Sequence, residues 1–235
     1  MSTQPDRVLT RRSLLALAGG AIVLAACGGD DGGATSDASS TDASGTTAAG
    51  GTTAASATTV AGAKRAKGEY QPVSITGDAL VQMPDGGTDA AIGKPAPALS
   101  GFSFDGSPLS ITPGSDGKKL MVVFLAHWCP HCRAEVPLLV EWMTTGRAPA
   151  DTRVVAVATS STNTRPNFPP SNWLKDEKWP VEVMADSETY DAAAAYGLTG
   201  FPYFVLINTD GTVARRVSGE VAPSDLKLFL DQSVT

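Results

Sequence analysis

Two cysteines, Cys129 and Cys132, lie three positions apart in the stretch Trp-Cys-Pro-His-Cys that begins at residue 128. On the first turn of a helix this spacing places both sulfurs on one face, near enough to close a disulfide. The upstream thiol can then attack a disulfide in another molecule, and the downstream thiol can resolve the mixed disulfide that results. The residue types and their spacing therefore indicate a redox-active dithiol.

The residues around this dithiol predict a strand-to-helix junction. Residues 120–126 form an apolar run without a charge, which is typical of a buried strand. Pro130 suits the first turn of a helix, which we expect to run to about residue 145, with Gly146 ending it. Cys129 would then lie at the helix N-terminus, where unpaired backbone N–H groups and the helix dipole stabilise a thiolate. His131 can add a donor or a positive charge that favours the same thiolate.

The remainder of the C-terminal part predicts alternating strands and helices around one core. Strands are expected at residues 73–75, 79–82, 102–104, 154–158, 181–184, 203–208 and 212–217, and helices at 172–178, 187–196 and 223–232. The pair Asp210-Gly211 is a strong hairpin signal. The polar loop 161–170 either merely connects a strand to a helix or lines a substrate groove.

Three segments carry a resemblance to a known family. They are residues 92–97 (Ile-Gly-Lys-Pro-Ala-Pro), residues 124–137 around the dithiol, and residues 200–208, which begin Gly-Phe-Pro. In this combination the chain resembles the extracytoplasmic thioredoxin-like thiol-disulfide oxidoreductases of the TlpA and ResA type over roughly its last 145 residues. The resemblance implies an α/β thioredoxin-like fold, with a central mixed sheet flanked by helices and an N-terminal strand extension. It also implies exchange with protein thiol and disulfide substrates.

The resemblance assigns roles to further residues by position. Pro202 matches a cis-proline beside the disulfide, and Phe201 would present backbone to the substrate; the alternative is an ordinary trans proline that starts a strand. Glu135 matches an acidic residue that relays the proton of the second cysteine; the alternative is an exposed glutamate paired with Arg133. Trp128 would offer an apolar contact surface to partner proteins, and His131 would join it in substrate binding.

Other features leave the direction of electron flow open. The strand position occupied by a buried aspartate in thioredoxin holds Val123 here, and the dipeptide Pro130-His131 is more typical of strongly oxidising DsbA-type proteins. Disulfide donation and reduction, for instance of apocytochrome thiols during haem attachment in cytochrome c maturation, both stay open.

Other uses of the two thiols are possible. A structural disulfide closing so short a loop would stabilise the fold by only about 2 kcal/mol. Zinc would need two more ligands, and the chain offers only Cys27, His127 and His131 as further cysteine or histidine candidates. We therefore expect no metal and no cofactor beyond the redox-active disulfide. A haem- or copper-handling chaperone would use the thiols as ligands. A peroxiredoxin-like peroxidase would need a proline and a threonine or serine where this chain has Val122 and Ala126.

The first 26 residues predict a signal peptide. Arg11-Arg12 resembles a twin-arginine signal, although a general secretory signal also fits, and residues 14–26 are apolar. Thirteen residues are too few to span a bilayer core of about 30 Å. Residues 24–27 resemble the lipobox of bacterial lipoproteins, which predicts lipidation of Cys27 and anchoring to the outer face of the cytoplasmic membrane.

Residues 27–69 are built mainly from Gly, Ala, Ser, Thr and Asp, so we expect a disordered linker with a reach of roughly 35 Å ahead of a thioredoxin-like domain at 70–235. An anchored dithiol protein outside the cytoplasm would exchange electrons with a membrane-bound partner. The net charge of −6, without a basic run, argues against nucleic acid binding.

Overall fold

The computed structural model describes residues 63–231; the predicted signal peptide, Cys27 and most of the predicted linker lie outside this range. In chain order the elements are β1 Ser74–Thr76, β2 Ala98–Phe102, β3 Pro108–Ile111, β4 Lys119–Leu125, α1 Pro130–Thr144, β5 Thr152–Ala158, α2 Pro170–Asp176, β6 Val183–Ala185, α3 Asp191–Ala195, β7 Tyr203–Ile207, β8 Val213–Ser218 and α4 Pro223–Asp231. Within the described range no helix is both long enough and apolar enough to cross a membrane.

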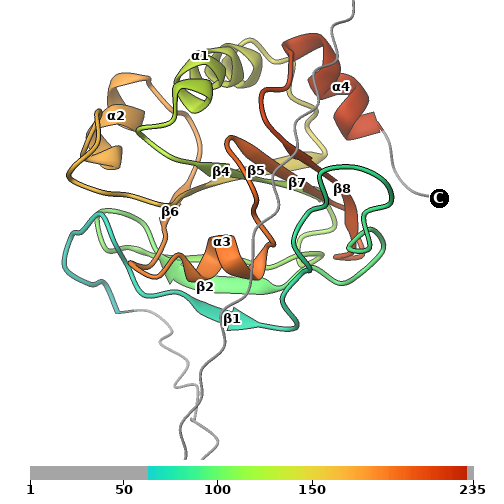
Figure 1. The fold of residues 1–235 in the computed structure, drawn as a ribbon, viewed down its shortest axis with the longest axis horizontal. Helices are drawn as coiled ribbons and strands as arrows, with labels where there is room; N and C mark the ends of the chain where they lie inside the picture. The colour runs from blue at the N-terminus through green and yellow to red at the C-terminus, as the bar shows by residue number, and fades with distance from the viewer. Residues whose placement is uncertain (1–62, 232–235) are drawn as a thin grey trace, which may run out of the picture. The chain divides into compact units, whose positions relative to one another are not determined.

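The strands form one mixed sheet in the order β1-β2-β6-β5-β4-β7-β8, with β3 also paired to β2. Strands β4, β5 and β6 run parallel, whereas β7 and β8 are antiparallel to their neighbours. Helices α1 and α4 cover one face and α3 covers the other (Figure 1). The predicted α/β thioredoxin-like fold with an N-terminal strand extension is confirmed, and β1 to β3 form that extension.

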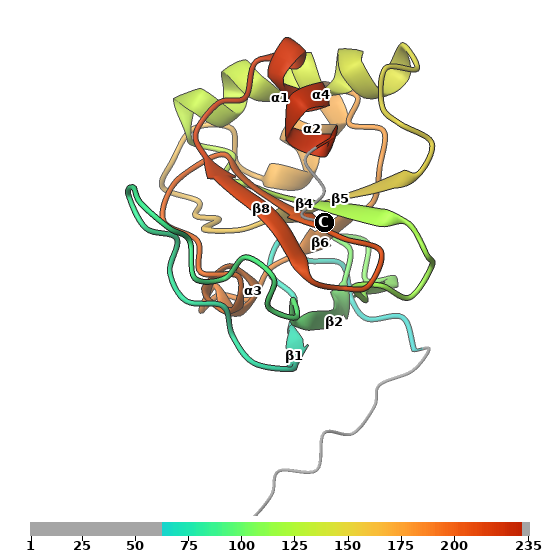
Figure 2. The same cartoon turned by 90° about the vertical axis from the view of Figure 1, so that its right-hand side faces the viewer.

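Strand β4 separates two apolar layers because its side chains alternate between the faces of the sheet. Met121 and Val123 pack with α1, α2 and α4, in the layer that also holds both cysteines. Val122 and Phe124 pack with α3 in the opposite layer. Figure 2 shows α1 and α4 on one side of the sheet and α3 on the other. Burial on both faces explains why residues 120–126 lack a charge.

The N-terminal extension differs most from the sequence-based expectations. Residues 79–82 form no strand, because the backbone N–H groups of Leu80 and Met83 donate to the carbonyls of Ala195 and Gly197 instead of to a neighbouring strand. Strand β3 was not predicted, and β2 begins at residue 98 rather than 102. These pairings join segments of the extension to each other and to the end of α3, which a local sequence pattern does not encode.

Residues just before the predicted domain boundary at residue 70 already contact the folded part. The N–H of Arg65 donates to the carbonyl of Gly106 at 2.8 Å, and that of Gly68 donates to the carbonyl of Phe104 at 2.9 Å. The carboxylate of Glu69 accepts hydrogen bonds from the backbone N–H and the hydroxyl of Ser171 at 3.0 and 2.6 Å. Residues 65–69 therefore belong to the folded part, since their polar groups find partners there.

Candidate functional site

The dithiol lies where β4 ends and α1 begins. Cys129 is the N-cap of α1 and Pro130 occupies the first turn, as predicted. No side chain caps this helix end, so the positive end of the helix dipole acts on Cys129 itself. Both cysteines are free thiols; Cys129 is 6% exposed and Cys132 is fully buried. The outer sulfur is thus the one that a partner can reach.

Cys132 is held as a neutral thiol. Its Sγ accepts a hydrogen bond from the backbone N–H of Ala126 at 3.5 Å. Burial raises the pKa of this thiol well above its ordinary value, and the neighbouring Cys129 and Glu135 raise it further. Cys132 must therefore lose a proton to a nearby base before it can attack a disulfide.

Glu135 is buried one turn below Cys132, with only 1% of its surface exposed. One carboxylate oxygen, Oε2, accepts a hydrogen bond from the backbone N–H of Val221 at 3.1 Å, whereas Oε1 has no protein partner. Burial raises the pKa of Glu135 to about 7, and the charge of Glu220 adds to this effect. A buried carboxyl that titrates near neutral pH is suited to accept and return a proton. The alternative of an exposed Glu135 paired with Arg133 is wrong.

Glu135 should make the stability of the fold depend on pH. Because its pKa is raised from 4.5 to about 7, the native state keeps this proton over a range in which the unfolded chain has released it. We expect the free energy of unfolding to fall by about 2–3 kcal/mol as the pH rises from about 4.5 to 7. Urea-induced unfolding of the native protein and of Glu135→Gln at about pH 5 and 8 measures this change, and the variant should lack it.

The measurement is read as the difference between variant and native protein, because His127 acts in the opposite sense. Burial lowers the pKa of His127, so its contribution to stability is lost as the pH falls below about 6.5. This contribution is common to both proteins and cancels in the difference. Equal pH slopes for native protein and Glu135→Gln would show that the fold does not retain the proton.

A cis peptide bond joins Phe201 to Pro202 beside the dithiol. The carbonyl of Phe201 lies 3.9 Å from the Sγ of Cys129. The carbonyl of Pro202 accepts a hydrogen bond from the backbone N–H of Gly219 at 2.8 Å, which fixes this turn to the end of β8. The structure thus brings Pro202, Phe201 and Cys129 together, although they are some 70 residues apart in the chain.

Trp128 forms an aromatic wall next to Cys129. Its indole N–H donates to the carbonyl of Ser160 at 2.8 Å, and its ring meets that of Phe201 edge to face, with centroids 5.8 Å apart. Both side chains are half-buried. They leave an apolar surface at the rim of the site, where a partner protein could make contact.

His131 contacts a carboxylate across the rim of the site. Its side chain is 67% exposed, and Nδ1 lies 2.6 Å from Oε1 of Glu220. A protonated His131 therefore forms an ion pair with the carboxylate of Glu220. This pairing weakens the stabilisation of a Cys129 thiolate that the sequence predicts for His131. Glu220 also lies next to Val221, which holds Glu135, so one short segment before α4 contacts both side chains.

His127, which the sequence offered only as a candidate zinc ligand, is buried and holds the loop 161–170. Its Nε2 accepts a hydrogen bond from the backbone N–H of Thr162 at 3.1 Å, and Nδ1 lies 2.7 Å from the carbonyl of Pro166. Asn167 donates to the carbonyl of His127 at 2.9 Å. A neutral ring with its proton on Nδ1 satisfies every one of these contacts. The only sequence signal was its place directly before Trp128.

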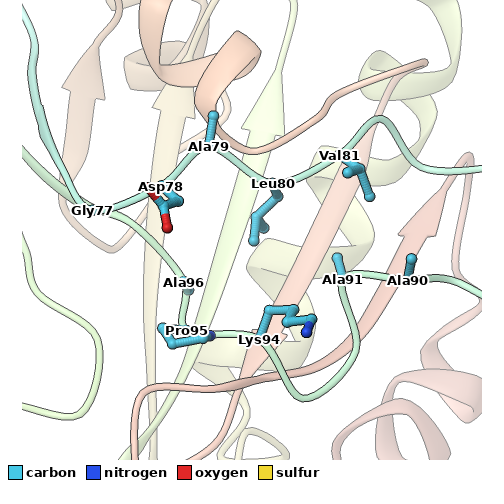
Figure 3. A pocket seen from close by; sticks show the side chains of 10 residues that line it. All are labelled: Gly77, Asp78, Ala79, Leu80, Val81, Ala90, Ala91, Lys94, Pro95 and Ala96. Carbon is cyan, nitrogen blue, oxygen red and sulfur yellow. The ribbon is translucent and has the colours of Figure 1, made fainter.

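A cavity of about 360 Å³ lies in the layer opposite the dithiol (Figure 3). Segments 77–81 and 90–96 form its walls, which are mainly apolar, with Asp78 and Lys94 as the charged side chains. It contains no cysteine or histidine, so it adds nothing to the chemistry of the dithiol. Within residues 63–231 no group of three or more His, Cys, Asp or Glu side chains is arranged to hold a metal ion.

Comparison with known proteins gives a family and several similar structures. Residues 91–227 match the family model described as Redoxin. A thioredoxin-family thiol:disulfide interchange protein from Chlorobium tepidum is 27% identical, with 62% of this chain and 99% of that chain covered and a TM-score of 0.49. StoA from Bacillus subtilis is 19% identical over 59% of this chain and 98% of that one, with a TM-score of 0.47. A putative thioredoxin from Neisseria meningitidis is 26% identical over 57% and 85%, with a TM-score of 0.47. A search of curated proteins finds no match.

Proposed function

The chain belongs to the Redoxin family, and we propose that it catalyses thiol–disulfide exchange on protein substrates through Cys129 and Cys132. One observation carries this proposal: an N-cap thiol at the rim of the site lies beside a fully buried thiol one turn along the same helix. Thiol:disulfide interchange proteins are among the proteins of known structure to which the chain is similar. No cofactor is needed, because the dithiol itself carries two electrons.

The exchange proceeds in two steps from the reduced protein. The Cys129 thiolate attacks one sulfur of a substrate disulfide, forms a mixed disulfide, and releases the other substrate sulfur, which takes up a proton. Glu135 then accepts the proton of Cys132, whose sulfur attacks the Sγ of Cys129 and releases the second substrate thiol. The protein becomes a disulfide as the substrate gains two electrons. Run in reverse, the same steps oxidise a substrate dithiol.

The residues around Cys129 can position a substrate for the exchange. The backbone of Phe201, ahead of cis-Pro202, lies against Cys129 and can hold an extended substrate segment, while Trp128 contacts its apolar side chains. His131 and Glu220 form the polar part of the rim. This division of roles rests on the geometry around Cys129 and on the resemblance of residues 200–208 to the TlpA and ResA type.

We also propose an extracytoplasmic location at the outer face of a bacterial cytoplasmic membrane, with Cys27 as the lipidated residue and a membrane-bound protein as electron partner. The predicted signal peptide, lipobox and linker support this proposal. Metabolic labelling with a fatty acid, in native protein and in Cys27→Ala, tests the anchor. Label in both proteins would overturn lipidation at Cys27.

The activity is tested by mixing the reduced protein with a peptide that contains one disulfide. The peptide should be reduced in a stoichiometric first turnover, and equilibration with glutathione then gives the reduction potential of the couple. A potential near that of DsbA favours disulfide donation, and one near that of thioredoxin favours reduction. Rapid catalytic peroxide consumption with no peptide exchange would favour a peroxidase, and tight copper binding with no exchange would favour a chaperone.

A further inference from the structure

The loop 161–170 is fixed against the dithiol junction from two sides. His127 makes the contacts with Thr162 and Pro166 described above, and its ring meets that of Phe168 edge to face, with centroids 5.7 Å apart. At the start of this segment, the carbonyl of Ser161 accepts a hydrogen bond from the hydroxyl of Tyr70 at 3.0 Å. One set of contacts comes from His127, directly after β4, and the other from Tyr70, ahead of β1. The loop therefore has a defined position beside the dithiol.

This placement puts Arg165 over the ring of Trp128. The guanidinium carbon of Arg165 lies 5.0 Å from the centre of the Trp128 ring, within the range of a cation–π contact. Trp128 itself contacts Phe201. Arg165, Trp128 and Phe201 therefore form a continuous row next to Cys129, which we call the aromatic rim. A guanidinium held over an aromatic ring by a cation–π contact can still donate N–H hydrogen bonds to a carboxylate.

The charge of Arg165 is not neutralised by this protein's own described residues. It is exposed, and among residues 63–231 no carboxylate lies within ion-pair distance of it. Arg133, one turn along α1 from Cys129, is likewise exposed and without such a carboxylate. Arg147, just after the far end of α1, is by contrast paired with Glu141. Two arginines without a carboxylate partner thus lie near the dithiol in a chain with a net charge of −6.

We propose that the aromatic rim selects substrates that carry an aspartate or glutamate close to the reacting cysteine. The apolar part of such a segment packs on Trp128 and Phe201, and its carboxylate pairs with the edge of the Arg165 guanidinium, with Arg133 adding long-range attraction. This inference rests on the proposed exchange activity and names the substrate class of the same site. It also gives the loop 161–170 a function beyond connecting β5 to α2.

The test compares the rates of exchange with three disulfide peptides that differ only beside one cysteine, where they carry Asp, Asn or Lys. At low ionic strength the native protein should react about three- to fivefold faster with the Asp peptide than with the Asn peptide, and slowest with the Lys peptide. Salt at about 0.5 M should bring these ratios close to one. Arg165→Gln should lose most of the Asp preference, and Arg165→Glu should invert it.

The matched control is Arg147→Gln, which removes the same charge at the far end of α1 and should leave the peptide ratios as they are in the native protein. Reaction of each variant with dithiothreitol reports whether its dithiol is intact. Equal rates with all three peptides, or an unchanged Asp preference in Arg165→Gln, would overturn the inference while the exchange activity stands. A native protein that reacts with none of the peptides would instead overturn the proposed function.

Discussion

Replacing Cys129 by serine should lower the rate of disulfide exchange by at least about a thousandfold. A serine hydroxyl is not ionised near neutral pH and does not form a disulfide, so the first attack is lost. Cys132 cannot take over, because it is fully buried and its thiol is held protonated by its surroundings. The rate of reduction of a peptide disulfide by the pre-reduced variant measures the effect.

Cys132→Ser is the matched variant, and it should fail at the second step rather than the first. Cys129 can still attack, but nothing releases the substrate, so a mixed disulfide with the peptide should accumulate and be seen by mass spectrometry. If Cys129→Ser kept near-native rates, or if it trapped the peptide through Cys132, the assignment of attacking and resolving sulfurs would be wrong.

The sequence predicted the position of the dithiol well because the relevant signals are local. The signals are a charge-free apolar run, two cysteines with a proline between them, and a helical pattern after them. Together they predict a strand-to-helix junction. The structure places Cys129 at the N-cap of α1, as expected. The Asp210-Gly211 turn between β7 and β8 is predictable for the same reason, since a hairpin turn is specified by its own residues.

The burial of Glu135 was not predictable from its own helix. A glutamate one turn after Cys132 could equally face solvent, and what covers it is the segment before α4, 86 residues later in the chain, through the N–H of Val221. The hydrogen bonds of His127 with the loop 161–170 likewise involve residues some 35 to 40 positions away. Both features come from tertiary packing, which local propensity does not encode.

The attachment of the N-terminal extension is also determined by tertiary contacts that local sequence does not predict. It was expected to contribute a strand at residues 79–82, but in the structure this segment is held partly by a buried arginine in β8. Arg216 has a fully buried side chain, donates to Asp89 from Nε at 2.7 Å and forms a second bond to the same carboxylate. It also donates to the carbonyls of Val81 at 2.8 Å and Tyr196 at 3.3 Å. One side chain thus joins the extension, the end of α3 and the sheet.

Arg216→Met should destabilise the fold by about 3–5 kcal/mol, because it leaves the carboxylate of Asp89 without its buried cation and the carbonyl of Val81 without its donor. For a domain of this size, that corresponds to a fall in Tm of roughly 10 °C or more. Urea-induced and thermal unfolding measure both quantities. The double variant Arg216→Met with Asp89→Leu should recover part of the loss, since it removes the unpaired charge as well.

The matched control is Arg153→Met, which breaks the more exposed pair between Arg153 and Glu182 and should cost less than about 1 kcal/mol. The contrast between the two arginines separates burial from pairing, because both side chains lie 2.7 Å from a carboxylate oxygen in the native protein. If Arg216→Met were no less stable than Arg153→Met, the extension would be held by its other contacts, among them the backbone hydrogen bonds of Leu80 and Met83 to residues 195 and 197. Protection of the Leu80 and Met83 amides from hydrogen exchange would then be the same in Arg216→Met as in the native protein.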